Sequence, residues 1–338
     1  MTPSERIQMA HGGGGQLTGE LIQQVILPAL GATSAGPMTD AAEIEGTGRL
    51  AFTTDSYVVR PLEFPGGDIG KMAVCGTVND LAVVGARPVA LSLGLIIQEG
   101  FEIELLRRLL ASAGQKAAQI GVPIVTGDTK VVGREGCDGL IINTAGIGRI
   151  PDGVRLGFDR IASGDKVLLS GPLGEHSLTI MTQREGLRIS SELISDCEAI
   201  DGLTSSLLER LGGGVKFVRD PTRGGLAAVL ADAAAATGRD IVIDERAIPV
   251  NRTARAAAEM LGLDLLSAAN EGKLVVFVAP EAADEALRIL AGHEIARHAA
   301  VIGAVGPAAD VPMVEMMTAI GGRRVVQMPY GEDLPRIC

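Results

Sequence analysis

Four aspartates of this chain lie at the edges of apolar runs rather than in polar stretches: Asp55, Asp80, Asp128 and Asp220. A buried carboxylate is costly unless it is paired or bound to a cation. Mg²⁺ prefers oxygen ligands and is commonly shared between carboxylates and nucleotide phosphates. The set therefore suggests a Mg²⁺–ATP site, although each aspartate taken singly is more simply explained as a cap or turn residue.

Of the segments that contain the four aspartates, residues 220–225, Asp-Pro-Thr-Arg-Gly-Gly, are the most informative. Its proline fixes a turn, Thr222 is a plausible N-cap, and two glycines from Gly224 onward open a predicted helix with accessible amides. This pattern favours a phosphate or oxyanion contact, and a simple helix cap also explains it. Asp128 and Lys130 are two residues apart in a predicted strand and must share a face, where they could form a plain ion pair.

Three further segments allow both a binding and a structural interpretation. Four glycines, residues 12–15, precede a predicted helix and could cradle phosphate or form a linker, but they lack the ending of a P-loop. His176 follows a strand in a glycine-rich turn, where it could bind a ligand or be structural. Residues 269–273, Ala-Asn-Glu-Gly-Lys, form an ordinary turn when taken alone.

The chain ends in a cysteine, Cys338, on a tail of residues 328–338. Two prolines, a glycine and two acids make the tail a poor helix and a poor central strand. A terminal thiol on such a segment could be a nucleophile carried between active sites, or the last residue of a frayed terminus. A prenylation motif is excluded because its cysteine lies four residues from the end.

Composition limits the class of protein. The 338 residues suggest two domains, and 45 glycines suggest many tight turns. The net charge of -11 argues against a nucleic-acid partner. No signal peptide or membrane-spanning stretch is evident, so we expect a cytoplasmic protein whose four widely spaced cysteines are free thiols.

Hydrophobic periodicity predicts two halves in which strands and helices alternate. In the first half we expect strands at 50–59, 89–97, 124–132 and 140–147, with helices from 16 to about 28, at 69–84 and at 102–120. A boundary follows at 149–165. In the second half we expect strands at 166–170, 241–243, 274–279 and near Val301 and Val325, with helices at 177–184, 196–211, 224–236, 252–261 and 281–291. Two such halves imply a ligand cleft between them.

The motifs in combination resemble one family end to end. They comprise the His11 glycine run, Thr54-Asp55-Ser56, Val78-Asn79-Asp80-Leu81, Gly127-Asp128-Thr129-Lys130, Arg184-Glu185-Gly186-Leu187, residues 220–225, Asn270-Glu271-Gly272 and the terminal Pro-Arg-Ile-Cys. The chain resembles the HypE family of carbamoyl dehydratases, which serve nickel-iron hydrogenase maturation. That family is related to aminoimidazole ribonucleotide synthetase and selenophosphate synthetase.

The resemblance implies a PurM-like α/β (α+β) protein of two domains. Residues 1–36 would form a glycine-rich segment and helix, and residues 37–150 an ATP-binding domain whose mixed sheet forms a homodimer interface. Residues 151–327 would form a second α/β domain, and residues 328–338 a mobile tail. Two departures from the family pattern are mild: the run after His11 is all glycine where a serine is common, and Glu175 stands where aspartate is usual, which leaves a specific role for Glu175 without support.

The resemblance also implies a reaction. A carbamoyltransferase, HypF, would load a carbamoyl group onto Cys338, and ATP would dehydrate it to a thiocyanate whose cyanide passes to iron on a HypC–HypD scaffold. We hypothesise that Glu271 is the base and that Lys130 positions it or stabilises the transferring phosphoryl group, while the four aspartates hold Mg²⁺. The ATP or phosphate contacts would be Gly13, Gly14, Asp55, Asn79, Asp80, Asp128, Thr129, Asp220, Thr222, Arg223, Gly224, His176 and Asn270.

Two other functions compete with this one. A related ATP-dependent synthetase could phosphorylate a free amide-like or selenium substrate, but it would have no use for a terminal thiol. A non-catalytic scaffold could use the tail to dock partners or carry metal, and it would not need ATP.

Overall fold

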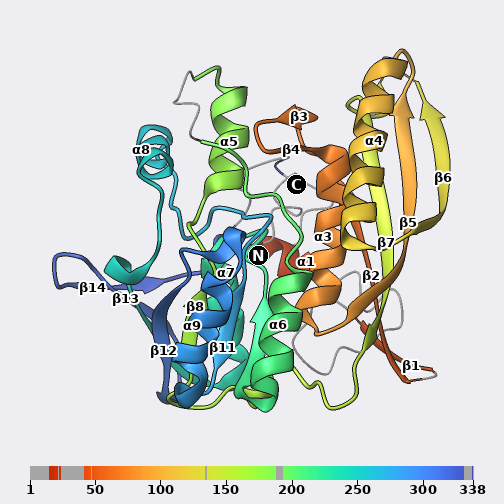
Figure 1. Ribbon diagram of the computed structural model, residues 1–338. Helices are drawn as coiled ribbons and strands as arrows, with labels where there is room; N and C mark the ends of the chain where they lie inside the picture. Colours follow the sequence, from red (N-terminus) through yellow and green to blue (C-terminus); the bar gives the residue numbers. More distant parts are fainter. Residues whose placement is uncertain are drawn as a thin grey trace.

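The computed structural model describes residues 15–21, 23, 42–46, 48–133, 135–187, 193–330 and 337 of the chain. Within them, two α/β domains stand side by side, each built on its own mixed sheet, as predicted (Figure 1). The predicted boundary segment, residues 149–165, connects the last strand of the first sheet to the first strand of the second.

The first domain contains a five-stranded sheet in the order β1-β2-β7-β5-β6. Neighbouring strands are antiparallel except β5 and β6, which are parallel and are connected by α4. A short hairpin, β3-β4, leads into α3. The bounds are α1 Gln16–Leu21, β1 Ala42–Gly46, β2 Gly48–Tyr57, β3 Glu63–Phe64, β4 Gly67–Asp68, α3 Ile69–Val83, β5 Arg87–Gln98, α4 Ile103–Ile120, β6 Ile124–Val132 and β7 Leu140–Ile150.

Among the described residues, α3 covers one face of this sheet, and no helix covers the other. Along β2, Ala51, Thr53 and Tyr57 are buried on the side of α3, whereas Phe52 is 40% exposed. Ile147, the cross-strand partner of Phe52 on β7, is 41% exposed. Because successive side chains of a strand point to opposite faces, the sheet has a buried inner face and an exposed outer face.

Helix α3 is buried on most sides because it lies between its own sheet and the second domain (Figure 1). Its N-cap is Asp68, whose carboxylate accepts two backbone N–H groups of the first turn at 2.8 and 2.9 Å. Gly70 lets α3 approach α4, since a Cβ there would lie 2.0 Å from the carbonyl oxygen of Leu109. Because α3 lies between the two domains, its residues Asn79 and Asp80 lie at the junction between them.

The second domain contains a seven-stranded sheet in the order β14-β13-β10-β12-β8-β11-β9. Only β10 and β13 pair in parallel. The bounds are β8 Lys166–Leu169, α5 Glu175–Arg184, α6 Asp201–Leu211, β9 Val215–Arg219, α7 Gly225–Thr237, β10 Arg239–Asp244, α8 Arg252–Leu261, β11 Val275–Val278, α9 Ala283–Ala291, β12 Ala300–Ala308, β13 Val314–Met317 and β14 Arg323–Val326.

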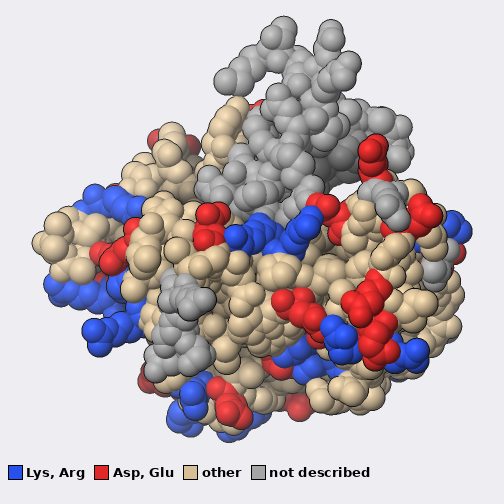
Figure 2. Space-filling model, turned by 90° about the horizontal axis from the view of Figure 1, so that it is seen from above, with Lys and Arg blue, Asp and Glu red and all other residues tan. Residues whose placement is uncertain are grey.

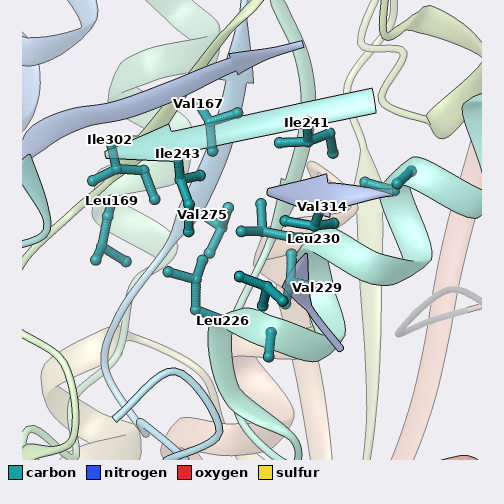
Figure 3. Close-up of a cluster of buried hydrophobic side chains, with 14 of the residues drawn as sticks. Val167, Leu169, Leu226, Val229, Leu230, Ile241, Ile243, Val275, Ile302 and Val314 are labelled. Carbon is teal, nitrogen blue, oxygen red and sulfur yellow. The ribbon is translucent and has the colours of Figure 1, made fainter. Parts of the chain in front are cut away.

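Both faces of the second sheet are covered by helices. On β8, Val167 and Leu169 join a cluster with α7, whereas Leu168 joins a separate cluster with α6 and α9. Figure 3 shows the first cluster, in which Leu226 and Leu230 of α7 lie against strand side chains. This sheet therefore has two buried faces where the first sheet has one.

The main disagreement with the predicted elements is the helix expected at 196–211, which begins only at Asp201. Residues 193–200 are irregular because tertiary partners take their backbone groups: the N–H of Ser195 donates to the Pro65 carbonyl, and that of Ile200 donates to the Asn79 side chain. Strands β1, β9 and β13 and the hairpin β3-β4 are absent from the prediction.

Charged side chains of both signs are interspersed over the face shown in Figure 2. Among the described helices, none combines the length and apolar character needed to span a bilayer.

Candidate active site at the domain junction

Asn270 ties together three loops of the second domain, those preceding α5, α7 and β11. Its side-chain oxygen accepts the Gly174 N–H at 2.8 Å, and its side-chain amide donates to the carbonyls of Pro221 (3.1 Å) and Ala268 (2.8 Å). Asn270 is fully buried. These bonds make it the residue that shapes the site, and its expected contact with nucleotide stays a prediction.

The predicted N-cap of α7 is wrong, because the helix begins at Gly225 with Gly224, not Thr222, as its N-cap. Gly224 has a φ of 77° and offers no side-chain cap. Gly225, with a φ of 60°, packs so tightly that a Cβ would lie 2.5 Å from the Leu266 carbonyl oxygen. The first turn of α7 therefore starts without a side-chain cap, beside the buried Asp220.

Glu271 is buried where carboxylates from both domains are gathered. Burial raises its pKa well above the ordinary value, and three neighbouring carboxylates raise it further: Asp220, Asp196 and Asp55. Arg223 opposes them, and its guanidinium lies 3.9 Å from the Asp55 carboxylate. Because its pKa is raised, the Glu271 carboxylate is a stronger base than an ordinary carboxylate, which suits it to accept a proton.

A buried ionic group fixes the backbone that carries Glu271. The backbone N–H groups of Glu271 and Gly272 donate to the two carboxylate oxygens of Asp196 at 3.3 and 3.2 Å. Lys273 lies 3.4 Å from Asp196 and 3.2 Å from Glu175. Burial alone would lower the pKa of Lys273, but Asp196 and Glu175 outweigh it and raise that pKa. Glu175 thus has a structural partner in Lys273.

Asn79 joins the first domain to this loop. Its side-chain amide donates to the carbonyls of Glu198 (3.1 Å) and Glu271 (3.3 Å), and its side-chain oxygen accepts the Ile200 N–H at 2.9 Å. The nucleotide contact expected of Asn79 stays a prediction, whereas these bonds show that it holds the two domains together.

Asp55 and Asp80 supply the first domain's carboxylates on the inner face. Thr53 donates to Asp80 at 2.8 Å. The pKa of the buried Tyr57 hydroxyl is raised by burial, then by Asp55 and Asp80, and least by Glu271. Asp55 and Asp220 thus both raise the pKa of Glu271 across the junction, and Asp80 acts with Asp55 on the pKa of Tyr57.

Asp128 and Lys130 lie elsewhere in the chain, on the outer face of the first sheet. They pair in register with Gly94 and Ile96 of β5, and their side chains are each 68% exposed, 3.0 Å apart. The predicted convergence of four aspartates within one chain therefore does not include Asp128. Thr129 lies in β6, and its side chain is outside the described residues. No group of three or more potential metal-binding side chains is found in the described part of the chain.

His176 contacts the end of the chain. One ring nitrogen, Nδ1, lies 2.8 Å from the Ser195 hydroxyl, and the other, Nε2, bonds to the carbonyl of Ile337, whose residue is only 4% exposed. Both ring nitrogens are thus engaged by protein, and the nucleotide contact expected of His176 stays a prediction. Gly13, Gly14 and Cys338 lie outside the described residues.

Several residues of the junction were missed by sequence reasoning, namely Ser195, Asp196, Cys197 and Lys273. The first three lie in residues 193–200, a largely apolar stretch. A polar residue within an apolar stretch is the same feature that singled out the four aspartates, so it could have identified Ser195 and Asp196. Cys197 lies close enough to Cys75 of α3 for the two thiols to interact, which raises the pKa of Cys197, a proximity that their separation in sequence conceals.

Comparison with known proteins agrees with this architecture. The model of the AIR synthase related protein N-terminal domain matches residues 38–150, and that of the C-terminal domain matches residues 162–313. The carbamoyl dehydratase HypE of Rhodobacter capsulatus is 47% identical over 99% of this chain and 98% of its own length.

Two solved structures are similar over most of the chain. A chain of the HypE–HypF complex has a TM-score of 0.86 at 41% identity, covering 91% of this chain and 99% of that one. HypE in complex with ATP has a TM-score of 0.83 at 42% identity, covering 98% and 100%. The matched domains and the near full-length identity show that this chain belongs to the HypE family of carbamoyl dehydratases.

Proposed function

We propose that this protein uses ATP to dehydrate a carbamoyl group carried on its own Cys338, in the maturation of nickel-iron hydrogenases. The observation that carries the proposal is the burial of Ile337 beside His176, at the junction where Glu271 lies. Consecutive Cα atoms are only about 3.8 Å apart, so a group on Cys338 is tethered close to that junction. The similar structure named as a complex with ATP supports ATP as the second substrate.

The chemistry accounts for the residues gathered there. A carbamoyl oxygen is a poor leaving group as hydroxide, so transfer of the γ-phosphoryl group of ATP to that oxygen converts it to a phosphate ester. The C–O bond then breaks, phosphate leaves with the electron pair, and the nitrogen gives up two protons. The products are a thiocyanate on Cys338, ADP and phosphate. Glu271, whose pKa is raised, is the proposed base for the nitrogen protons.

Mg²⁺ prefers hard oxygen donors such as carboxylates, and Asp220 and Asp55 are close enough to Glu271 to raise its pKa. Asp55, Asp80 and Asp220 are the proposed ligands. When bound, the ion would neutralise charge on the phosphates during transfer. Arg223 and the uncapped first turn of α7 would bind phosphate oxygens, with Thr222, Gly224, Gly13 and Gly14 as the further expected contacts.

A homodimer would cover the outer face of the first sheet. Phe52 and Ile147 form an exposed apolar pair there. Four residues further along β2, the registers align Ser56, Asn143, Gly94 and Asp128 in one row across four strands. A second copy lying on this face would bury the apolar pair and bring Asp128 and Lys130 into contact with its partner. Lys130 would then stabilise charge at the transferring phosphoryl group from across the interface.

The partners follow from the same scheme. The similar chain in the HypE–HypF complex supports HypF as the carbamoyltransferase that loads Cys338. The HypC–HypD complex is the proposed acceptor that receives cyanide for iron. Exchange with both requires the terminal thiol to leave the junction and return.

The decisive measurement is mass spectrometry of the C-terminal peptide after incubation with HypF, carbamoyl phosphate and ATP. We expect a carbamoyl adduct on Cys338 that loses water only when ATP is present, and no adduct on a Cys338→Ser variant. An adduct that persists while ATP is hydrolysed would contradict the proposal. An unmodified tail with ATP turnover on an added small substrate would indicate the free-substrate synthetase instead.

A further inference from the structure

His176 forms a contact that the proposed reaction does not itself require. It is fully buried on α5, and its ring meets the ring of Phe64 edge-on, with centroids 5.5 Å apart and planes at 80°. Phe64 belongs to the first domain and His176 to the second, so the imidazole is held from both sides of the junction. Burial lowers the pKa of His176, which favours the neutral ring.

The hydrogen bonds fix the tautomer of that neutral ring. A carbonyl oxygen only accepts, so Nε2 must carry the proton and donate it to the carbonyl of Ile337. Nδ1 is then unprotonated and accepts from the Ser195 hydroxyl at 2.8 Å. The Ser195 oxygen in turn accepts the Cys197 N–H at 3.1 Å. In this series of hydrogen bonds each group donates to the next, and the last acceptor is the backbone carbonyl of Ile337.

Ser195 is itself held by the first domain, because its backbone N–H donates to the Pro65 carbonyl at 2.9 Å. The close approach depends on Gly66, where a Cβ would lie 2.5 Å from the Ser195 carbonyl oxygen. The His176 ring, which donates to the tail, is therefore held in place by residues of both domains.

The side chain of Ile337 is buried in an apolar cluster that is also shared between the domains. Its members include Phe64, Ile69 and Met72 of the first domain, and Ile180 and Ala269 of the second. A buried carbonyl without a donor and a vacated aliphatic site would both be costly. The backbone contact and the side-chain contact thus favour the same position of residue 337.

We propose that His176, oriented by Ser195, is a docking site for the chain's own tail: it binds the backbone carbonyl of residue 337, while the surrounding apolar cluster selects an isoleucine-sized side chain. His176 is a positioning residue, since it contacts the residue before the reacting thiol. Under the function proposed above, docking would be needed for dehydration and release would be needed for carbamoyl loading. The two half-reactions should therefore respond to His176 in opposite directions.

The first test measures docking without ATP or partner proteins. Carboxypeptidase Y is added to the full-length protein, and removal of Cys338 and then Ile337 is followed by intact mass. Because cleavage tracks the undocked population when docking equilibrates rapidly, His176→Phe should be trimmed roughly tenfold faster than the parent. His176→Gln, which keeps an N–H donor, should fall between the two. The matched control is His293→Phe. His293 also pairs with a serine, because its Nε2 lies 3.1 Å from the Ser206 hydroxyl, and it does not contact Ile337.

Tail variants test the same site from the other side and leave the rest of the fold unchanged. Ile337→Val should be trimmed about threefold faster because one methyl group is lost, and Ile337→Asp at least tenfold faster because a carboxylate would be buried. If His176→Phe and Ile337→Asp were both trimmed at the parental rate, the docking site would be wrong.

The second test separates docking from the reaction. With HypF and carbamoyl phosphate, carbamoylation of Cys338 in His176→Phe should be at least as fast as in the parent. At equal carbamoylation, its ATP-dependent loss of water should be about tenfold slower. A parent that is never dehydrated, with faster trimming in His176→Phe, would refute the function and keep the docking site. If the carbamoyl group of the parent protein loses water but all variants are trimmed at the same rate, the function stands and the docking site is wrong.

Discussion

The domain junction and the outer face of the first sheet each contain a lysine beside a carboxylate, in opposite surroundings. At the junction, the side chain of Lys273 is 6% exposed and that of Asp196 is 1% exposed, 3.4 Å apart. On the outer face, Lys130 and Asp128 are both 68% exposed, 3.0 Å apart. The distances are similar, so burial decides what each pair contributes. Exposed pairs add about 0–1 kcal/mol, whereas breaking a buried pair leaves a desolvated charge and costs several times more.

Two asparagines repeat the contrast. Asn79 is buried and bonds three backbone groups of the second domain. Asn143 is exposed on the outer face, where its side-chain amide donates to Asp55 O at 2.8 Å and Ser56 Oγ at 2.9 Å. The junction thus buries polar groups that bond both domains, while the outer face presents similar groups to solvent, where water can replace their partners.

The largest effect is expected for Lys273→Met, which removes the cation from the junction. Asp196 would be left buried without its ion partner, and unfolding free energy should fall by about 3–5 kcal/mol. Urea denaturation of this variant beside Lys130→Met measures the difference directly. The additional change Asp196→Asn should recover part of the loss. A cost below about 1 kcal/mol would mean that the buried and exposed pairs are equivalent.

Glu271→Gln tests whether the buried carboxyl is kept for chemistry at the expense of stability. ATP-dependent loss of water from the carbamoylated tail should fall by about 100-fold or more. Because the folded pKa of Glu271 is raised, its stabilising effect is complete below the unfolded pKa of about 4.3 and is lost as the pH rises through the folded pKa. Glu271→Gln has no group that titrates at this position, so it does not lose this stability as the pH rises. Its melting temperature should match the parent near pH 4 and exceed it increasingly at higher pH, and a constant difference would contradict the raised pKa.

Asn79→Ala should destabilise the protein by about 2 kcal/mol, because the Ile200 N–H loses its acceptor and two carbonyls lose their donor. Asn143→Ala is the matched control, since its amide also has several partners but water can replace them. Its cost should be about 0.5 kcal/mol or less. Thermal melts of the two variants, measured at equal ionic strength, sharpen the comparison. Equal losses would show that exposure does not separate the two asparagines.

The regular elements of this molecule could be predicted because each rests on local periodicity: the expected strand at 124–132 coincides with β6, and the helix at 252–261 with α8. The site was only half predictable. Asp220 and Glu271 belong to recognisable motifs, but Asp196 becomes their neighbour through an irregular segment pinned by both domains. Asp128 failed to join the other aspartates because strand alternation fixes only which residues share a face. Which face is buried depends on the whole sheet.

Only a small effect on stability is expected for Lys130→Met, below about 1 kcal/mol, because both members of its ion pair are solvated. Its effect on the reaction should nevertheless be visible, at about a tenfold slower loss of water, if a second copy receives Lys130. A mixture of Lys130→Met chains and Cys338→Ser chains tests this arrangement. The first kind retains the reacting thiol and the second retains the lysine, so mixed dimers should regain dehydration if Lys130 acts across the interface. If mixing restores nothing while Lys130→Met alone is impaired, Lys130 must act within its own chain, around the edge strand β6. If Lys130→Met is fully active, the outer-face pair has no part in the reaction, and the contrast with the junction is one of stability alone.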